Sequence, residues 1–160
     1  MERHPRQSVT VYVFSFLHGE PRFLTLMKSS RSRLGGAWQA IHGSIRERER
    51  AFDAAFREVR EQTGLTPDRF FRVEYVEVFY QEDTDAIHTI PVFAAHVANL
   101  PRPQLGPRHT DYEWCHLDET LARFQFATQQ RAAALIANAL TPWPEVGIDL
   151  RDITGYLGGR

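Results

Sequence analysis

Acidic side chains recur at helical spacing between Gly43 and Leu65, the part of the chain whose residue types can do chemistry. Glu58 and Glu61 stand three positions apart, and Gln62 follows directly. Carboxylates at i and i+3 lie on one face of a helix. Such a pair can converge on one or two Mg²⁺ or Mn²⁺ ions, which prefer oxygen ligands. The alternative is a solvated helix face on which these acids pair with neighbouring arginines.

A helix must hold these acids in place, and one is predicted over residues 49–63. Good helix formers fill this stretch, and Gly64 follows where a left-handed C-cap belongs. Its apolar stripe has the spacing i, i+3, i+4, i+7 and consists of Phe52, Ala55, Phe56 and Val59. At about 100° per residue, Glu58, Glu61 and Gln62 share a face roughly 120° from this stripe. Packing the stripe on a sheet turns the acids toward a rim or cleft.

Around this helix the chain alternates strand-like and turn-like segments. Two β-rich runs, residues 7–18 and 22–28, are separated by Gly and Pro and predict a hairpin. Further strands are predicted over residues 70–81, 87–97 and 112–116, and helices over residues 118–124 and 128–140. Strands before and after a helix, followed by closing helices, predict an α/β protein with a mixed sheet flanked by helices.

Aromatic side chains are dense in the strand predicted after the motif helix: Phe70, Phe71, Tyr75, Phe79 and Tyr80. Such rings can stack a nucleobase. At strand spacing, however, a place in the core is the commoner role. Trp38 lies next to the expected site and fits either role.

Composition indicates an ordinary globular protein of 160 residues. Lys and Arg number 19 against 20 Asp and Glu, which argues against a nucleic-acid partner. No apolar run approaches the roughly 20 residues that span a bilayer, so we expect no membrane partner and a cytoplasmic location. Cys115 is the only cysteine, which favours a buried structural thiol over redox chemistry. The sequence leaves a homodimer open.

The whole segment resembles the signature of the Nudix hydrolase superfamily. Eight of its nine specified positions match, namely Gly43, Glu49, Arg57, Glu58, Val59, Glu61, Gly64 and Leu65, and Gln62 is the exception. The resemblance extends to about Leu140 and is similar to the branch of bacterial dihydroneopterin triphosphate pyrophosphatases. It implies a Nudix-type α/β/α sandwich and a single domain over residues 1–160, with an irregular tail at 141–160. Gly43 is expected to form a sharp turn.

The resemblance also implies an activity, the hydrolysis of the pyrophosphate bond in a nucleotide or pterin triphosphate type of substrate. The family uses Mg²⁺ or Mn²⁺ for this reaction. Carried over by position, Glu58, Glu61, Glu49 and Arg57 are the catalytic set. Glu58 and Glu61 are metal ligands, and Glu58 is also the candidate base for the attacking water. The backbone carbonyl of His42 completes the metal shell.

Two departures from the family pattern imply weaker metal binding and weaker activity. Gln62 stands where the family has a carboxylate ligand, and an amide oxygen can coordinate but carries no negative charge. Relatives of this branch usually have a glutamate directly before the histidine that matches His109, and Arg108 stands there instead. The resemblance places Trp38, Arg108 and His109 at the substrate, where Arg108 can bind phosphate.

These departures leave a second function open, a catalytically silent Nudix domain that binds a nucleotide or a partner protein. A hydrolase requires a divalent cation and turns over its substrate. A binding domain is stabilised by its ligand without hydrolysis.

Overall fold

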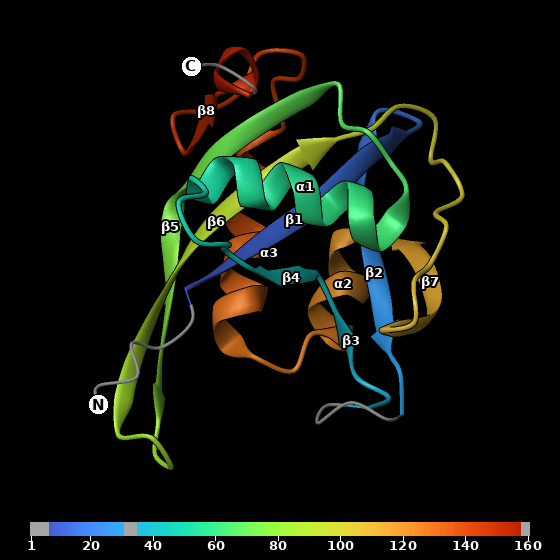
Figure 1. The fold of residues 1–160 in the computed structure, drawn as a ribbon. Helices are drawn as coiled ribbons and strands as arrows, with labels where there is room; N and C mark the ends of the chain where they lie inside the picture. Colours follow the sequence, from blue (N-terminus) through green and yellow to red (C-terminus); the bar gives the residue numbers. More distant parts are fainter. Residues whose placement is uncertain (1–6, 31–34, 158–160) are drawn as a thin grey trace.

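The computed structural model describes residues 7–30 and 35–157, which form one mixed sheet with helices on both faces (Figure 1). The strands are β1 (Ser8–Leu17), β2 (Glu20–Lys28), β3 (Trp38–Gln39), β4 (Ile41–Ser44), β5 (Arg69–Gln81), β6 (Ala86–His96), β7 (His109–Cys115) and β8 (Leu150–Asp152). The helices are α1 (Ala51–Thr63), α2 (Leu117–Arg123), α3 (Ala127–Ala139) and a 3₁₀ turn, η1 (Thr154–Tyr156).

The sheet is built around β1, which pairs with β2 and β4 antiparallel and with β6 parallel. The order is β3-β2-β1-β6-β5-β8, with β4 on β1 and β7 on β2. Residues 9–14 of β1 are buried without interruption, as expected for a central strand covered on both faces. The predicted mixed sheet and α/β/α sandwich are therefore confirmed.

Two apolar cores lie on the two faces of this sheet. α1 covers one face, and the buried residues there include Val11, Leu26, Val59, Phe70 and Phe93. α2 and α3 cover the other face, with Tyr12, Phe14, Phe71, Phe124 and Ile136. Each fully buried Phe or Leu side chain contributes roughly 1.5–3 kcal/mol. These cores hold α1 and β4 in contact, and the acidic motif lies on these two elements.

The predicted elements are present with small shifts at their ends. α1 begins two residues later than expected and ends as predicted, at Thr63, with Gly64 in the left-handed region at φ 70°. The hairpin β1–β2 turns at residues 18 and 19, so Pro21 lies inside β2 rather than in the turn. Cys115 is buried, as expected. Among helices in the described ranges, none is long and apolar enough to cross a membrane.

The tail differs from the expectation of an irregular segment. β8 adds to the edge of β5 with Phe71 opposite Asp152. Arg69 on β5 donates hydrogen bonds to Asp152 Oδ2 and to the Pro144 carbonyl. The signal for this edge strand is only three residues long, which is too short for a periodic pattern.

β5 and β6 extend beyond the rest of the sheet as a long two-stranded arm (Figure 1). β1 pairs with β6 only from Val92 to His96. Among the described strands, none pairs with the outer edge of residues 86–91. Phe79, Tyr80 and Ile87 on this arm are exposed.

Candidate active site

The acidic motif lies where α1 passes over β4, and Gly43 makes the close approach possible. A Cβ at Gly43 would stand 2.3 Å from Cδ of Glu58, so any side chain there would displace this carboxylate. Gly43 lies inside β4 and does not form the sharp turn expected from the sequence. Its missing side chain instead lets Glu58, which is 3% exposed, pack against the strand.

Arg57 donates hydrogen bonds to three carboxylates. Its Nε and Nη2 donate to both oxygens of Glu49, at 2.8 and 2.9 Å. Its Nη1 donates to Glu58 Oε1 at 2.9 Å and to Glu61 Oε2 at 3.1 Å, and Nη2 also reaches the Ser44 carbonyl. These hydrogen bonds from Arg57 lower the pKa of Glu49 to about 2. The motif arginine is thus the centre of a charge network that fixes the loop on α1.

Glu61 lies at the outer end of this network. Its side chain is 47% exposed and accepts a second hydrogen bond at 3.1 Å from Arg46, which is itself exposed. Arg46 lies between β4 and α1 in the chain. The loop between β4 and α1 brings it to Glu61, and the backbone N–H of Arg46 also donates to Glu49 Oε1.

Gln62 is buried between α1 and β4. Its Nε2 donates to the His42 carbonyl at 3.0 Å and to Glu58 Oε2 at 2.7 Å. Both partners are pure acceptors, so the amide must present its nitrogen to them and not its oxygen. Gln62 Oε1 is left buried with no hydrogen-bond partner among the described residues. An uncharged donor thus lies between two oxygens that the family pattern assigns to a cation.

The side chain of His42 lies on the face of the sheet away from α1, because its neighbours Ile41 and Gly43 face that helix. It lies 3.5 Å from Thr10 Oγ1, which also donates weakly to Glu77 at 3.4 Å. Tyr12 donates to the other Glu77 oxygen at 2.8 Å. Glu77 is buried, and burial raises its pKa. The sequence analysis missed Glu77, although an acid at an inward position of a strand could have signalled it.

The residues expected at the substrate are divided between two places. Arg108 is exposed, and its Nη1 lies 3.8 Å from Glu58 Oε2. His109 is buried beside Gln39, at 3.5 Å, and burial lowers its pKa to about 4. Trp38 packs against α2, where the Arg123 guanidinium covers its ring at 4.2 Å.

The donor set at the motif can be tested against a divalent cation. Glu58, Glu61, the His42 carbonyl and Gln62 Oε1 all offer oxygen, the ligand atom that Mg²⁺ and Mn²⁺ prefer. Gln62 Oε1 accepts no hydrogen bond from the described residues, so none of its hydrogen bonds there would be lost when it coordinates a cation. The residues therefore fit a hard divalent cation, with one negative charge fewer than the family pattern. A cation on Glu58 Oε2 and the His42 carbonyl competes with the Gln62 amide nitrogen for the same acceptors.

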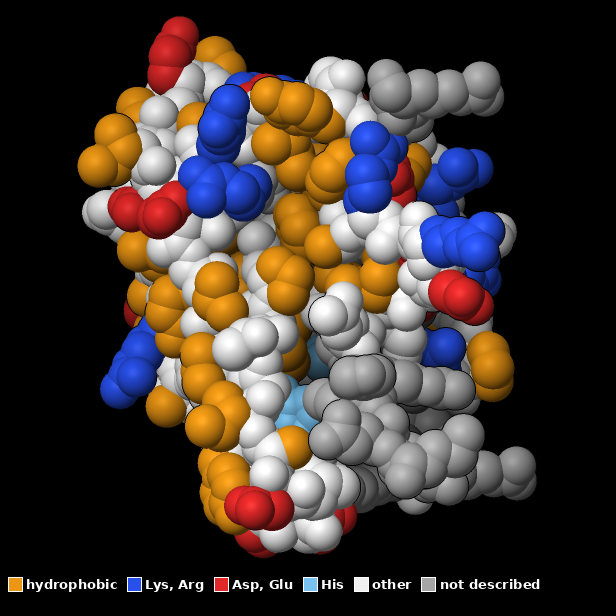
Figure 2. Space-filling view, turned by 60° about the vertical axis from the view of Figure 1, so that its left-hand side comes forward, with side chains coloured by type: hydrophobic (Ala, Val, Ile, Leu, Met, Phe, Trp, Pro, Cys, Tyr) orange, Lys and Arg blue, Asp and Glu red, His pale blue; other side chains and the backbone are white. Residues whose placement is uncertain are grey.

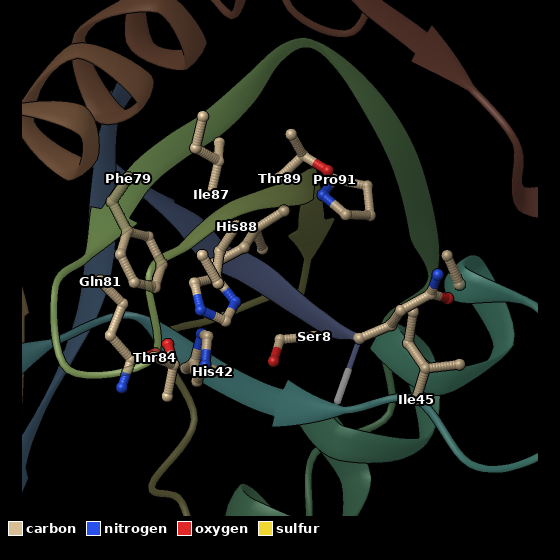
Figure 3. Close-up of a pocket in the computed structure, with 14 residues that line it drawn as sticks. Ser8, His42, Ile45, Phe79, Gln81, Thr84, Ile87, His88, Thr89 and Pro91 are labelled. Carbon is tan, nitrogen blue, oxygen red and sulfur yellow. The ribbon is translucent and has the colours of Figure 1, made fainter. Parts of the chain in front are cut away.

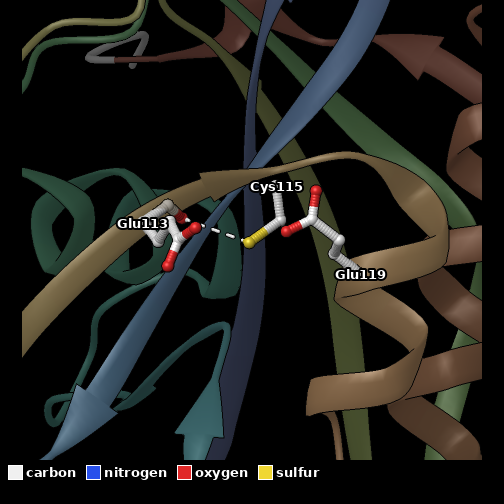
Figure 4. Close-up of side chains that lie close together, drawn as sticks. All are labelled: Glu113, Cys115 and Glu119. Atoms are coloured by element: carbon white, nitrogen blue, oxygen red, sulfur yellow. Dashed lines mark hydrogen bonds between the residues drawn. The ribbon is translucent and has the colours of Figure 1, made fainter.

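A second cluster of potential ligands lies on the other side of the molecule. Atoms of Glu113, Cys115 and Glu119 come within 4.8 Å of one another (Figure 4). Burial raises the pKa of the Cys115 thiol, which disfavours the thiolate that binds metals. Glu113 is also engaged by Arg123 at 2.7 Å. These contacts favour a structural role for the thiol.

Known proteins resemble this chain in sequence and in fold. The family profile of the NUDIX domain matches residues 4–136. A curated protein from Myxococcus xanthus, named octanoyltransferase, is 30% identical over 141 residues that cover 81% of this chain. The match spans 37% of that relative's length, so its name describes a much longer protein.

Solved structures share the fold. A Caenorhabditis elegans Ap4A hydrolase in a binary complex aligns with a TM-score of 0.73 at 19% identity, covering 87% of this chain and 100% of that one. The Escherichia coli dihydroneopterin triphosphate pyrophosphohydrolase aligns with a TM-score of 0.69 at 19% identity, covering 81% of this chain and 93% of that one. At these identities the likeness concerns the fold.

Proposed function

The chain belongs to the Nudix family, and from this premise we propose that it hydrolyses a phosphoanhydride bond in a nucleotide or pterin triphosphate type of substrate. The observation that carries the proposal is the contact of the Gln62 amide with both Glu58 and the His42 carbonyl where α1 crosses β4, with Glu61 joined to Glu58 through Arg57. Family members are pyrophosphohydrolases, and the two similar structures are named for Ap4A and dihydroneopterin triphosphate.

The cation would be held by Glu58, Glu61 and the His42 carbonyl, and by Gln62 Oε1 once the amide turns its oxygen toward them in place of its nitrogen. When bound, Mg²⁺ or Mn²⁺ neutralises phosphate charge and lowers the pKa of a coordinated water. Gln62 adds no negative charge to this set of metal ligands, which weakens the site. We therefore expect a Mn²⁺ or Mg²⁺ affinity lower than a three-carboxylate site would have.

Glu58 is the residue we propose to accept a proton from the attacking water. Arg57 holds its Oε1 and Gln62 holds its Oε2, so both oxygens are oriented before substrate arrives. Arg57 also orients Glu61, which makes Arg57 a positioning residue. The exposed guanidinium of Arg108 is available to bind substrate phosphate close to Glu58.

A second candidate function is a Nudix domain that binds a nucleotide or a partner protein without hydrolysis. The position of Gln62 Nε2 favours it, because this donor stabilises the buried Glu58 carboxylate without any cation. Arg57 supplies the compensating charge. Such a domain binds its ligand equally well in the presence of a chelator.

The experiment incubates the full chain with nucleoside triphosphates, dihydroneopterin triphosphate and dinucleoside polyphosphates, with Mg²⁺, Mn²⁺ or EDTA. We expect metal-dependent release of a monophosphate and pyrophosphate from a triphosphate, or of two nucleotides from a dinucleoside polyphosphate, and a loss of about 100-fold or more in Glu58→Gln. Glu47→Gln is the matched control, because Glu47 is exposed. No turnover of any compound, together with thermal stabilisation by a triphosphate in EDTA, would establish the binding domain instead.

A further inference from the structure

Arg46, in the loop between β4 and α1, has an exposed guanidinium that is held at the motif by one weak contact. Its Nη2 donates to Glu61 Oε1 at 3.1 Å, and the two side chains are 64% and 47% exposed. Exposed pairs of this kind recur on the molecule, and Figure 2 shows Lys and Arg side chains beside acidic ones on one face. Such a pair contributes only about 1.4- to 5-fold to an equilibrium constant.

The backbone of Arg46 is fixed independently of its side chain. Its N–H donates to Glu49 Oε1 at 3.0 Å, and its carbonyl accepts from the N–H of Glu49 at 3.1 Å. Ile45, the preceding residue, lines a cavity of about 1020 Å³ beside β6 (Figure 3), whereas the side chain of Arg46 lies at the surface. The guanidinium can therefore leave Glu61 without any change in the course of the loop.

Arg57 contacts the other oxygen of Glu61 and is held far more firmly than Arg46. Its side chain donates hydrogen bonds to four residues: Glu49, Glu58, Glu61 and Ser44. It is 16% exposed, against 64% for Arg46. Of the two guanidinium groups on Glu61, that of Arg46 is therefore the one that can be displaced.

Glu61 belongs to the set of oxygen donors that fits a divalent cation, and Arg46 competes for it. Two positive groups on one carboxylate repel each other more strongly the closer they lie. In the cation-free site the charges of Arg46 and Glu61 cancel, whereas a cation on Glu61 leaves Arg46 with an uncompensated positive charge. We propose that Arg46 is a phosphate-binding residue that pairs with Glu61 in the cation-free site and is released to the substrate when the cation binds.

The released guanidinium suits a substrate with more than one phosphate. Its planar fork of N–H donors binds phosphate oxygens in pairs. Arg46 contacts Glu61 and Arg108 lies 3.8 Å from Glu58, so two guanidinium groups flank different acids of the motif. Because coupling between two ligands is reciprocal, the phosphate group also favours the cation. The inference rests on the proposed function and adds a link between cation binding and phosphate binding.

The first part of the test measures Mn²⁺ alone, by electron paramagnetic resonance on the full chain and its variants. Arg60→Gln is the matched control, because Arg60 is exposed on α1 and its guanidinium lies over the Phe56 ring. Arg46→Gln removes the group that competes for Glu61, so it should bind Mn²⁺ about 1.4- to 5-fold more tightly than Arg60→Gln does. The Nε–H signal of Arg46, identified by its absence from Arg46→Gln, should shift when Mg²⁺ is added.

The second part measures methylenebisphosphonate, a diphosphate analogue whose carbon bridge cannot be hydrolysed, by calorimetry. In saturating Mg²⁺, Arg46→Gln should bind it about 5-fold or more weakly than Arg60→Gln does, because a guanidinium fork binds phosphate more strongly than a single surface pair. In EDTA the two variants should bind it nearly equally, because Arg46 then stays on Glu61. Arg46→Lys keeps the charge without the fork and should give an intermediate affinity in Mg²⁺.

Equal Mn²⁺ affinities in Arg46→Gln and Arg60→Gln would overturn the inference. A loss of bisphosphonate affinity in Arg46→Gln that is as large in EDTA as in Mg²⁺ would also overturn it, and so would a parent protein that binds no Mn²⁺. If the variants differ as expected but no compound is turned over, the proposed hydrolysis is contradicted and the exchange at Arg46 stands.

Discussion

The amide nitrogen of Gln62 determines how the oxygens of the motif are paired. Its amide nitrogen satisfies Glu58 and the His42 carbonyl at once, and these are the oxygens that a cation would otherwise draw together. A neutral amide makes these contacts at neutral pH without recruiting an ion. The substitution therefore affects both the stability of the cation-free fold and the affinity for metal.

We predict that Gln62→Glu reverses this balance. The new carboxylate would face Glu58 and the His42 carbonyl, and it has no N–H group to donate to either of them. The metal-free protein should therefore lose roughly 1–3 kcal/mol of unfolding free energy. Added Mn²⁺ should bind about tenfold more tightly and restore the melting temperature. Thermal melts across a Mn²⁺ titration measure both effects. Gln125→Glu makes the same charge change at an exposed position and should show neither.

We predict that Glu77 makes the stability of the fold depend on pH. Burial raises its pKa in the folded protein above the ordinary value of 4.5. Glu77 makes its full favourable contribution to the free energy of unfolding below about pH 4.5. This contribution is lost as the pH rises through the pKa that Glu77 has in the folded protein, because folding then requires burial of the charged carboxylate. Glu77→Gln removes this loss. Urea unfolding between pH 4 and 8 should show the stability of the parent falling relative to the variant, and parallel pH profiles would contradict the assignment.

At the scale of elements, the motif depends on the contact between α1 and β4. Gly43 brings the strand against Glu58, and Gly64 ends the helix in the left-handed region so that the chain can turn toward β5. Arg57 then joins the loop to the helix through Glu49 and Ser44. The acids are therefore fixed by two elements and not by helical spacing alone.

We expect Gly43→Ala to separate these elements. Its Cβ would overlap Glu58 Cδ, so the carboxylate has to leave its place between Arg57 and Gln62. The expected loss is about 1–3 kcal/mol, typical of overpacking a buried contact, together with the loss of metal-dependent turnover. Gly106→Ala is the control, since a Cβ there meets nothing within 4 Å. Equal unfolding midpoints in the two variants would show that the close approach has no energetic role.

At the scale of the whole molecule, the segment after α3 completes one edge of the sheet. Trp143 lies against Phe16 at 4.9 Å and His96 at 4.7 Å, and the guanidinium of Arg69 covers its ring at 4.6 Å. β8 continues this contact along the edge of β5. The tail is thereby part of the core that supports β5 and β6, the two strands that form the arm beside the cavity.

Trp143→Ala should therefore destabilise the entire fold. Removing a large, partly buried ring leaves a cavity and is expected to lower the free energy of unfolding by about 2–4 kcal/mol. At this chain length the melting temperature should fall by roughly 5–15 °C. Ile148→Ala, at a side chain 96% exposed in the same segment, should change stability by less than about 0.5 kcal/mol. A Trp143→Ala melt that matches the parent would mean that the tail is not docked.

Features that depend on neighbours along the chain can be predicted from the amino-acid sequence. Helical periodicity and the terminal Gly64 predict α1, and i, i+3, i+4 spacing places Glu58, Glu61 and Gln62 side by side. Tertiary structure decided the rest, because each remaining contact joins residues far apart in sequence. The orientation of the Gln62 amide depends on a carbonyl in β4, and the ring of Trp38 lies under Arg123 of α2. Local periodicity contains no information on which distant residue a side chain meets.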